Sequence, residues 1–304
     1  MTCYGPTIAY YSKELNPTGK RSLVFNKQLS QSGIPIKLPC GQCIGCRMEK
    51  ARQWAVRCMH EKRMHPTSLS AFLTLTYSDE FLPEGNTLVK RDLQLFMKRL
   101  RLERPAGVRF FACGEYGDQR QRAHYHVLLF NEGFPDRRLY SKSKAGHDQY
   151  TSKELDALWG LGACYIGEVT YESCAYVARY IMKKVSGDPA RDYYQTLTPD
   201  GVLIDRVPEF VTMSRRPGIG FTWFQKHHGE AFQHDSIIAN GKEAPIPSYY
   251  NKLYEKLDPN HLIRLKRKRR LLQVLRKPDN TKARLRIRET VALAKSKIYN
   301  RGNQ

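Results

Sequence analysis

Several features are missing from this 304-residue sequence, and each absence narrows the class of protein. No apolar run approaches the roughly 18 residues of a membrane span. The N-terminal segment lacks the charged-then-apolar order of a signal peptide, so we expect a cytoplasmic protein with no membrane partner. Internal repeats and low-complexity tracts are also absent, and 41% of the residues are hydrophobic. The chain is therefore expected to bury a core and to fold without a partner.

Acidic residues are scarce compared with basic ones. The sequence has 51 Lys and Arg against 29 Asp and Glu, so the formal net charge is 51 − 29 = +22. Such an excess repels itself unless a polyanion or salt offsets it. The charge therefore indicates nucleic acid as the first choice of partner and an anionic membrane surface as the second.

The eight cysteines suit thiols or metal ligands better than a secreted disulfide scaffold. Three of them, Cys40, Cys43 and Cys46, are spaced so that they could wrap a structural Zn²⁺ ion if a fourth ligand exists. The next along the chain is Cys58, but on an unbroken helix it would lie about 18 Å beyond Cys46. Cys3 or another segment would then have to serve. The alternative is a set of reduced thiols packed at a helix start.

The spacing of apolar residues predicts an α+β fold. Helical periodicity predicts helices over 42–64, 88–104 and 171–185, and runs of β-branched and aromatic residues predict strands over 71–77, 108–116, 123–131 and 163–170. A further short helix is expected to begin at an N-cap at Thr151, to run to Trp159 and to be ended by Gly162. The loop between the strands over 108–116 and 123–131 is too short for a crossover, so these two strands form a hairpin. The order β-α-β-β-α-β is that of the split β-α-β fold, an antiparallel sheet with helices packed on it.

Residues 188–245 have a weaker pattern, interrupted by proline and glycine, and we expect an irregular subordinate region in which 221–232 could form a helix. A basic tail follows over 246–304. From Arg264 to Arg288 it has twelve Lys and Arg against the single acid Asp279. The candidate DNA-binding residues in this run are Arg264, Lys266, Arg267, Lys268, Arg269 and Arg270. A charge run is usually a solvated face, but this density favours a phosphate-contacting helical tail or a partly disordered arm that orders on binding.

A histidine pair provides a candidate metal site. His124 and His126 are two apart in an expected strand, so their side chains point to one face about 6 to 7 Å apart. In the hairpin, antiparallel pairing can bring the carboxylate of Glu115 to the same face as a third ligand. Two imidazoles and a carboxylate suit Mg²⁺, Mn²⁺ or a transition metal that holds a phosphate oxygen. The competing interpretations are exposed or hydrogen-bonded histidines and a surface carboxylate.

Two tyrosines provide candidate nucleophiles. Tyr176 and Tyr180 are four apart on an expected helix, so both phenols can meet one phosphate. Arg179, Lys183 and Lys184 lie close enough in sequence to favour phenolate or to neutralise phosphate charge, which matters because a phenol is a poor nucleophile at neutral pH. The alternative is a pair of half-buried aromatic residues on a basic helix face.

The sequence resembles the HUH endonucleases that initiate rolling-circle replication in the order and spacing of three motifs. These are the strand Phe72–Tyr77, the His124-Tyr125-His126 motif and the Tyr176–Tyr180 segment with Lys183. More closely, the segments 39–47 and 52–58 resemble replication initiators of the gokushovirus branch of the microviruses, which are single-stranded-DNA bacteriophages. The resemblance covers roughly residues 39–185. Tyr125 departs from the motif, whose middle position is a bulky hydrophobic residue.

The resemblance implies a chemistry. Metal at His124 and His126, with Glu115, would polarise the scissile phosphate at a single-stranded origin. One tyrosine would attack and leave a 5′-phosphotyrosine and a 3′-hydroxyl for the host DNA polymerase. The second would cut the regenerated origin of the double-stranded replicative form, and the displaced strand would be joined into a circle. Because no Walker-type phosphate loop is present, a host helicase is expected to unwind the duplex.

The sequence patterns and the resemblance together predict four segments: an N-terminal segment over 1–40, an HUH nickase domain over 41–187, the irregular region and the tail. Two other functions stay open at this point. One is a sequence-specific DNA-binding protein without enzymatic activity that uses the cysteine cluster and basic helices. The other is an HUH nuclease of plasmid mobilisation or transposition.

Overall fold

A computed structural model describes residues 3–66, 68–104, 107–117, 120–143, 146–179, 189–198, 200–275 and 277–301 of the chain. The chain forms two compact units. The larger is Lys50–Leu262, and the smaller joins Met1–Glu49 to Ile263–Gln304. A division of the chain into consecutive sequence segments cannot describe these two units, because the smaller unit is built from both ends of the chain.

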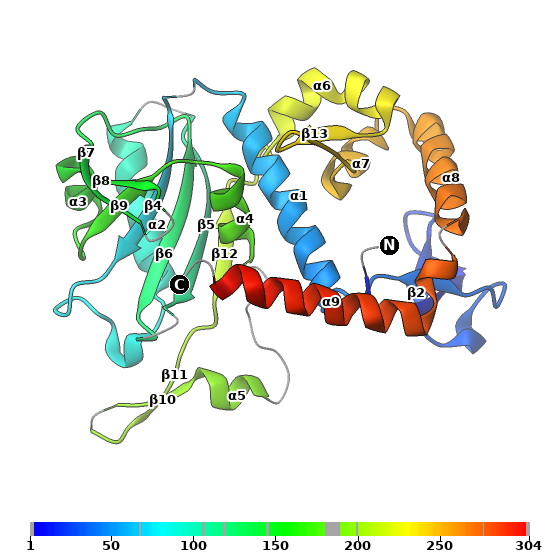
Figure 1. Cartoon of the computed structure of the whole chain (residues 1–304), viewed down its shortest axis with the longest axis horizontal. Helices are drawn as coiled ribbons and strands as arrows, with labels where there is room; N and C mark the ends of the chain where they lie inside the picture. The colour runs from blue at the N-terminus through cyan, green and yellow to red at the C-terminus, as the bar shows by residue number, and fades with distance from the viewer. Residues whose placement is uncertain are drawn as a thin grey trace. The chain divides into compact units, whose positions relative to one another are not determined.

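The larger unit is built on a seven-stranded antiparallel sheet (Figure 1). Its strands, in their order across the sheet, are β12 (Phe210–Met213), β5 (Arg109–Tyr116), β6 (Ala123–Phe130), β4 (Ser70–Thr76), β9 (Cys164–Gly167), β8 (Asp148–Thr151) and β7 (Arg138–Lys142). Helix α2 (Lys90–Glu103) joins β4 to β5, and β6 lies between these two strands in the sheet. The expected antiparallel α+β architecture is confirmed, as is the β5–β6 hairpin.

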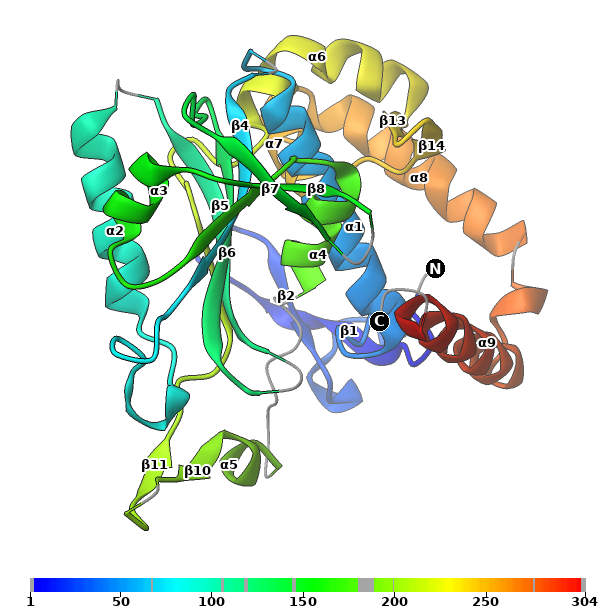
Figure 2. The same cartoon turned by 60° about the vertical axis from the view of Figure 1, so that its left-hand side comes forward.

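Helices cover both faces of the sheet (Figures 1 and 2). On one face α2 and α3 (Lys153–Trp159) pack on the odd-numbered residues of β4 and β6, in a core that includes Leu73, Tyr125 and Trp159. On the other face α4 (Tyr171–Arg179) and part of α1 (Ile44–Lys62) pack on residues such as Leu128 and Phe130. Side chains of a strand alternate between the faces, so neighbouring residues of β6 belong to different cores.

Strand β12 corrects the expectation for residues 188–245. It pairs with β5 and forms one edge of the main sheet. The other elements of the region are α5 (Pro189–Tyr194), β10 (Gln195–Leu197), β11 (Leu203–Asp205), α6 (Phe221–His234), β13 (Ile237–Ala239) and β14 (Lys242–Ala244). The expectation of irregular structure was wrong because a strand of four residues between turns has too few positions to show a period. The helix expected over 221–232 is confirmed by α6.

The ends of α3 also differ from expectation. Ser152, not Thr151, is the N-cap, and its hydroxyl accepts a hydrogen bond from the Leu155 amide at 3.0 Å. Thr151 is instead the last residue of β8. The helix ends at Gly160, whose φ of 67° is left-handed, and not at Gly162. A glycine suits that cap because it adopts positive φ without a steric penalty.

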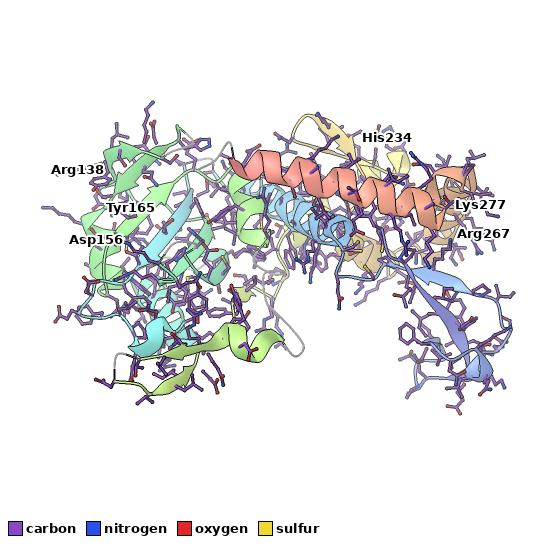
Figure 3. The ribbon with its side chains drawn as sticks, turned by 60° about the horizontal axis from the view of Figure 1, so that its bottom comes forward. Arg138, Asp156, Tyr165, His234, Arg267 and Lys277 are labelled. Carbon is purple, nitrogen blue, oxygen red and sulfur yellow. The ribbon has the colours of Figure 1, made fainter. Side chains whose placement is uncertain are left out.

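The smaller unit contains strands that the sequence did not reveal. These are β1 (Thr7–Leu15), β2 (Arg21–Val24) and β3 (Ile36–Leu38), which form a sheet in the order β2-β1-β3, with the short helix η1 (Lys27–Leu29). The C-terminal part of the unit is helical, with α8 (Pro259–Leu275), η4 (Pro278–Asn280) and α9 (Lys282–Arg301). Two short helices of the larger unit complete the description: η2 (Glu84–Asn86) precedes α2, and α7 (Ser248–Tyr254) precedes α8. Figure 3 labels Arg267 on α8 and Lys277 just beyond it. Of the two forms expected for the tail, the described residues adopt the helical one. None of the described helices is long and apolar enough to cross a bilayer.

Candidate active site

The register of the β5–β6 hairpin brings three of the predicted ligands together. Glu115 is directly opposite His124, and His126 is opposite Cys113. Because paired residues share a face and side chains alternate along a strand, Glu115, His124 and His126 all lie on the face that α4 covers. The sequence predicted this convergence, and the geometry agrees with it.

One carboxylate oxygen lies at the centre of the group. Oε1 of Glu115 is 2.7 Å from His124 Nε2 and 3.0 Å from His126 Nε2. The two imidazole rings are perpendicular, with centroids 5.0 Å apart. Glu115 is only 2% exposed and His126 6%. These polar groups therefore converge in a site with little access for bulk water.

Helix α4 adds Tyr176 to the same point. Its hydroxyl donates a hydrogen bond of 3.1 Å to Glu115 Oε1, and its ring lies edge-on to His126 with centroids 5.2 Å apart. Cys174, Val177 and Ala178 are buried on the side of α4 that faces the sheet, and they fix the helix there. Tyr176 is 36% exposed as a whole residue, so it lies at the edge of this buried group of side chains.

Both nitrogens of His124 face oxygen atoms that accept hydrogen bonds. Its Nδ1 is 3.1 Å from the carbonyl oxygen of Arg122, and its Nε2 is 2.7 Å from Glu115 Oε1. A carboxylate and an unprotonated Nε2 at 2.7 Å would repel each other, so a proton or a metal ion must lie between them. With a metal ion at Nε2, the proton of the ring would lie on Nδ1 and be donated to the Arg122 carbonyl. A metal-ligating histidine has this arrangement, with its other N–H donated to a carbonyl.

His126 has a partner that the sequence did not identify. Nδ1 of His126 is 3.1 Å from the hydroxyl of Thr74, which is directly opposite it on β4. A hydroxyl can donate or accept, so Thr74 supports either tautomer of His126. Thr74 stands in the strand expected over 71–77, but its position opposite His126 depends on the β4–β6 register. No pattern in the sequence specifies that register.

Electrostatics favours an ionised Glu115 carboxylate beside a neutral His126 imidazole. Burial opposes the charge of Glu115, but hydrogen bonds from His124 and His126 outweigh it and lower the pKa of the carboxyl to about 2. Burial lowers the pKa of His126, despite the nearby carboxylate. Both shifts leave the groups in the protonation states that coordinate a metal ion.

The donor set fits a divalent cation. One ligand atom from each of Glu115, His124 and His126 lies within 4.8 Å of the others. The second oxygen of Glu115, Oε2, is buried and has no hydrogen-bond partner among the described residues. A buried carboxylate oxygen without a partner is costly, and a bound cation would satisfy it. The residues present thus fit the ion expected from the sequence.

Tyr125 belongs to the opposite core, which explains the departure from the hydrophobic middle residue of the HUH motif. It is fully buried, and its hydroxyl donates to the carbonyl of Val89 and accepts from the Val89 amide, both at 2.9 Å. Burial raises the pKa of Tyr125 to about 12, so it stays a neutral phenol. Its ring fills the hydrophobic position of the motif, and its hydroxyl is satisfied by the chain.

The remaining predicted residues divide into three groups. Arg179 is described and exposed at the end of α4. Tyr180, Lys183 and Lys184 lie outside the described residues. The cysteine cluster belongs to the smaller unit, and Cys58 is not part of it, because its thiol is buried in the larger unit with that of Cys174.

The fold and site describe an α+β protein with a histidine, carboxylate and tyrosine centre, and sequence comparisons identify its family. The family described as replication-associated protein ORF2 matches residues 70–185, which include this centre. Replication-associated protein VP4 of Bdellovibrio phage phiMH2K is 34% identical over 85% of this chain and 79% of its own length. Replication-associated protein ORF2 of Spiroplasma virus 4 is 34% identical over 72% and 68%, and ORF4 of Chlamydia phage 1 is 29% identical over 76% and 56%. The chain belongs to the replication-associated proteins of microviruses. No solved structure matches it.

Proposed function

We propose that this protein initiates rolling-circle replication by nicking one DNA strand at the phage origin, with Tyr176 as a nucleophile. One observation carries the proposal: the Tyr176 hydroxyl meets the same Glu115 oxygen that both imidazoles contact. A phosphate bound at this carboxylate-imidazole centre would lie beside the phenol. Such proximity is what nucleophilic attack requires.

The sheet supports an HUH-type fold for the larger unit. Strands β5, β6, β4 and β9 are adjacent in that order, as in a split β-α-β arrangement. Helix α2 connects β4 to β5, and α3 lies in the connection from β6 to β9, after the additional strands β7 and β8. The histidines come from the central strand β6 and the tyrosine from the helix that follows β9. This matches the order of motifs that the sequence shares with the HUH endonucleases.

His124, His126 and Glu115 would hold Mg²⁺ or Mn²⁺. When bound, the ion would withdraw electron density from the scissile phosphate and so make its phosphorus a better electrophile. The chain itself orients the ligands: the Arg122 carbonyl would accept the Nδ1 proton of a metal-bound His124, and Thr74 holds the ring of His126. Burial of Glu115 excludes water that would compete for the site.

The reaction exchanges one phosphate ester for another. The bond between the phosphorus and the DNA 3′-oxygen breaks as a bond to the Tyr176 oxygen forms, and the phenolic hydrogen is balanced by the hydrogen of the new 3′-hydroxyl. The products are a 5′-phosphotyrosine and a 3′ end that a host polymerase can extend. Because the ester energy is retained, the reverse attack by a 3′-hydroxyl rejoins a strand, which would circularise the displaced copy.

Tyr180, with Lys183 and Lys184, remains the proposed second nucleophile and its cations, while Arg179 would neutralise phosphate charge near Tyr176. Alternating attack by two tyrosines would allow repeated cutting of the same origin. A host helicase would open the duplex, and the host cytoplasm is the proposed location. The basic residues of α8, from Arg264 to Arg270, would contact phosphates outside the site.

Covalent trapping tests the proposal. Full-length protein mixed with a single-stranded origin oligonucleotide and Mn²⁺ should give a complex that survives denaturing electrophoresis. Tyr176→Phe with Tyr180→Phe should abolish this complex, whereas Tyr193→Phe, an exposed tyrosine on α5, should leave it unchanged. His124→Ala should remove metal-dependent cleavage with less effect on DNA affinity.

Two outcomes would contradict the proposal. A denaturant-resistant complex that persists in the double tyrosine variant would exclude these nucleophiles. Specific binding without any covalent complex, across origin sequences and divalent ions, would favour the binding-only alternative. The phage relatives favour the viral initiator over a plasmid or transposon nuclease.

A further inference from the structure

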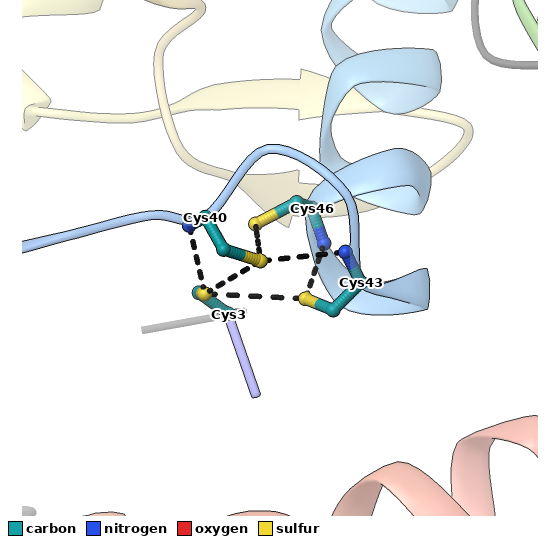
Figure 4. A group of neighbouring side chains, drawn as sticks. All are labelled: Cys3, Cys40, Cys43 and Cys46. Carbon is teal, nitrogen blue, oxygen red and sulfur yellow. Dashed lines mark hydrogen bonds between the residues drawn. The ribbon is translucent and has the colours of Figure 1, made fainter. Parts of the chain in front are cut away.

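Four cysteines gather in the smaller unit (Figure 4). Cys40, Cys43 and Cys46 come from the loop and first turn of α1, and Cys3 approaches them from the N-terminal segment. All four are free thiols, and Cys3 is fully buried. The sequence had suggested the triad, but only the structure selects Cys3 as the fourth member.

The distances between the sulfurs are those of a set of ligands around one ion. Sγ of Cys3 is 3.5 Å from that of Cys40 and 3.9 Å from that of Cys43, and Cys40 Sγ is 4.0 Å from Cys46 Sγ. All four lie within 4.8 Å of one another. A tetrahedral ion with Zn–S bonds of about 2.3 Å places its sulfurs about 3.8 Å apart. An iron–sulfur cluster contains several ions between its cysteines and would hold them farther apart.

Main-chain amides are directed at the sulfurs. The Cys40 amide donates to Cys3 Sγ at 3.2 Å, and the Tyr4 amide donates to Cys43 Sγ at 3.3 Å. The Cys43 amide donates to Cys40 Sγ at 3.4 Å, and the Cys46 amide to Cys43 Sγ at 3.5 Å. Hydrogen bonds to sulfur stabilise thiolates over thiols, and outer hydrogen bonds of this kind orient metal ligands. The sulfurs of Cys3, Cys40 and Cys43 thus each accept at least one main-chain hydrogen bond.

We propose that Cys3, Cys40, Cys43 and Cys46 bind one Zn²⁺ ion as four thiolates. Soft sulfur ligands in a closed tetrahedral set are those of structural zinc sites, which leave no open position for catalysis. The site is separate from the Glu115 centre in both unit and chemistry. It goes beyond the proposed nicking reaction and does not depend on it.

The surroundings offset the charge of such a site. A divalent ion with four thiolates carries a net charge of −2, and Cys43 and Cys46 stand at the N-terminus of α1, where the helix dipole favours negative charge. Cys3 also borders a cavity of about 230 Å³ lined by Lys37, Arg270 and Lys277. These three cations come from both ends of the chain, within the same unit.

The ion would act as a structural cross-link. It would connect residue 3 to residues 40–46 and thereby close a loop that contains β1, β2 and β3. This loop has few buried apolar residues, since many of its large side chains, such as Phe25, Leu15 and Ile34, are exposed. A segment without much core of its own gains stability from a metal that binds only the folded state.

Metal analysis of the full-length protein tests the site. After dialysis against a weak chelator, wild type should retain about one Zn²⁺ per chain. Cys3→Ser and Cys43→Ser should each lose most of it. Cys58→Ala is the matched control, because it removes a buried thiol outside the cluster, and it should retain the ion. Zinc loss in Cys58→Ala but not in Cys3→Ser would overturn the proposed ligand set.

Cobalt substitution distinguishes this site from the one at Glu115 without relying on a cysteine variant. Wild type and His124→Ala loaded with Co²⁺ should both show the intense tetrahedral visible bands and the near-ultraviolet thiolate-to-cobalt charge transfer of a four-sulfur site. Octahedral spectra, iron with acid-labile sulfide, or metal-free protein with eight titratable thiols and an unaltered fold would each overturn the proposal.

Limited proteolysis tests whether the ion stabilises the loop that contains β1, β2 and β3. Removal of zinc with a strong chelator should expose the trypsin sites at Lys13, Lys20 and Arg21 to cleavage and leave the larger unit intact, and restored Zn²⁺ should reverse the effect. Equal cleavage rates with and without zinc would exclude a structural role. Failure here would leave the covalent complex of the nicking test unaffected, so the two proposals can fail separately.

Discussion

The hydroxyl of Tyr176 donates a hydrogen bond of 3.1 Å to Oε1 of Glu115, a residue 61 positions earlier in the chain. The same oxygen meets both imidazoles, so one atom connects the helix that carries the phenol to the two strands of the hairpin. Glu115 is therefore expected to position the phenol as well as to coordinate the ion, and substitutions at Glu115 and at its neighbours should separate these roles.

Glu115→Gln keeps the size of the side chain and removes its charge. We expect Mn²⁺ affinity to fall by roughly 100-fold or more, because an anionic ligand becomes a neutral amide beside two imidazoles. Nicking at saturating DNA, measured as a function of Mn²⁺ concentration, checks this. Glu172→Gln removes an exposed carboxylate of α4 and should leave the titration unchanged. Equal metal dependence in both variants would remove Glu115 from the ligand set.

Thr74→Val removes the hydroxyl that supports His126 Nδ1 and nearly preserves the volume. Loss of such an outer partner should weaken metal affinity about 10- to 100-fold. Thr74→Ser retains the hydroxyl and should remain close to wild type. The thermal melts of the metal-free proteins control for stability, and a Val variant with wild-type metal affinity would show that Thr74 has only a packing role.

Acid should destabilise the larger unit through His60. This histidine stacks on Trp223, and its Nδ1 is 3.0 Å from the hydroxyl of Tyr250. Burial, together with the positive charge of Arg63 and the nearby His227, lowers the pKa of His60 from an ordinary 6.5 to about 3. Between these values only the unfolded chain binds the proton. Stability is therefore present above pH 6.5 and lost as the pH falls toward 3, by up to about 1.4 kcal/mol per pH unit.

Denaturant unfolding across that pH range measures the effect. His60→Gln keeps an acceptor for Tyr250 but does not titrate, so its stability should fall less steeply with acid than that of wild type. His234→Phe replaces an exposed histidine of α6, labelled in Figure 3, and should keep the wild-type slope. Identical slopes in the three proteins would show that His60 is protonated equally in both states.

The basic helix α8 should contribute to the salt dependence of DNA binding. Arg264, Arg267 and Lys268 are exposed, and their replacement by Gln should reduce the log–log slope by about 0.7 to 0.9 for each phosphate that the helix no longer neutralises. Nicking of a saturating short oligonucleotide should survive. Arg284 and Arg288 are already paired with Asp279, so replacing them should change the slope less. An unchanged slope in the α8 variant would refute phosphate binding by this helix.

Local patterns predicted the elements that surround the site. Period-two alternation put His124 and His126 on one face of a strand, and helical spacing predicted α1 and α2 close to their observed bounds. A short loop predicted the β5–β6 hairpin, and with it the approach of Glu115. Helix ends were less predictable: Thr151 and Ser152 are both good caps, and the pairing of β8 decided between them.

The sequence by itself determined the candidate donor residues, because residue type and the period of a strand or helix are local properties. Tertiary structure alone decided which distant residues join that set. Thr74 reaches His126 only through the β4–β6 register, Tyr176 reaches Glu115 only because buried residues of α4 dock that helix on the sheet, and Cys3 completes its cluster across 37 residues of chain. Such contacts are set by packing between segments that share no local pattern, so no spacing along the chain could specify them.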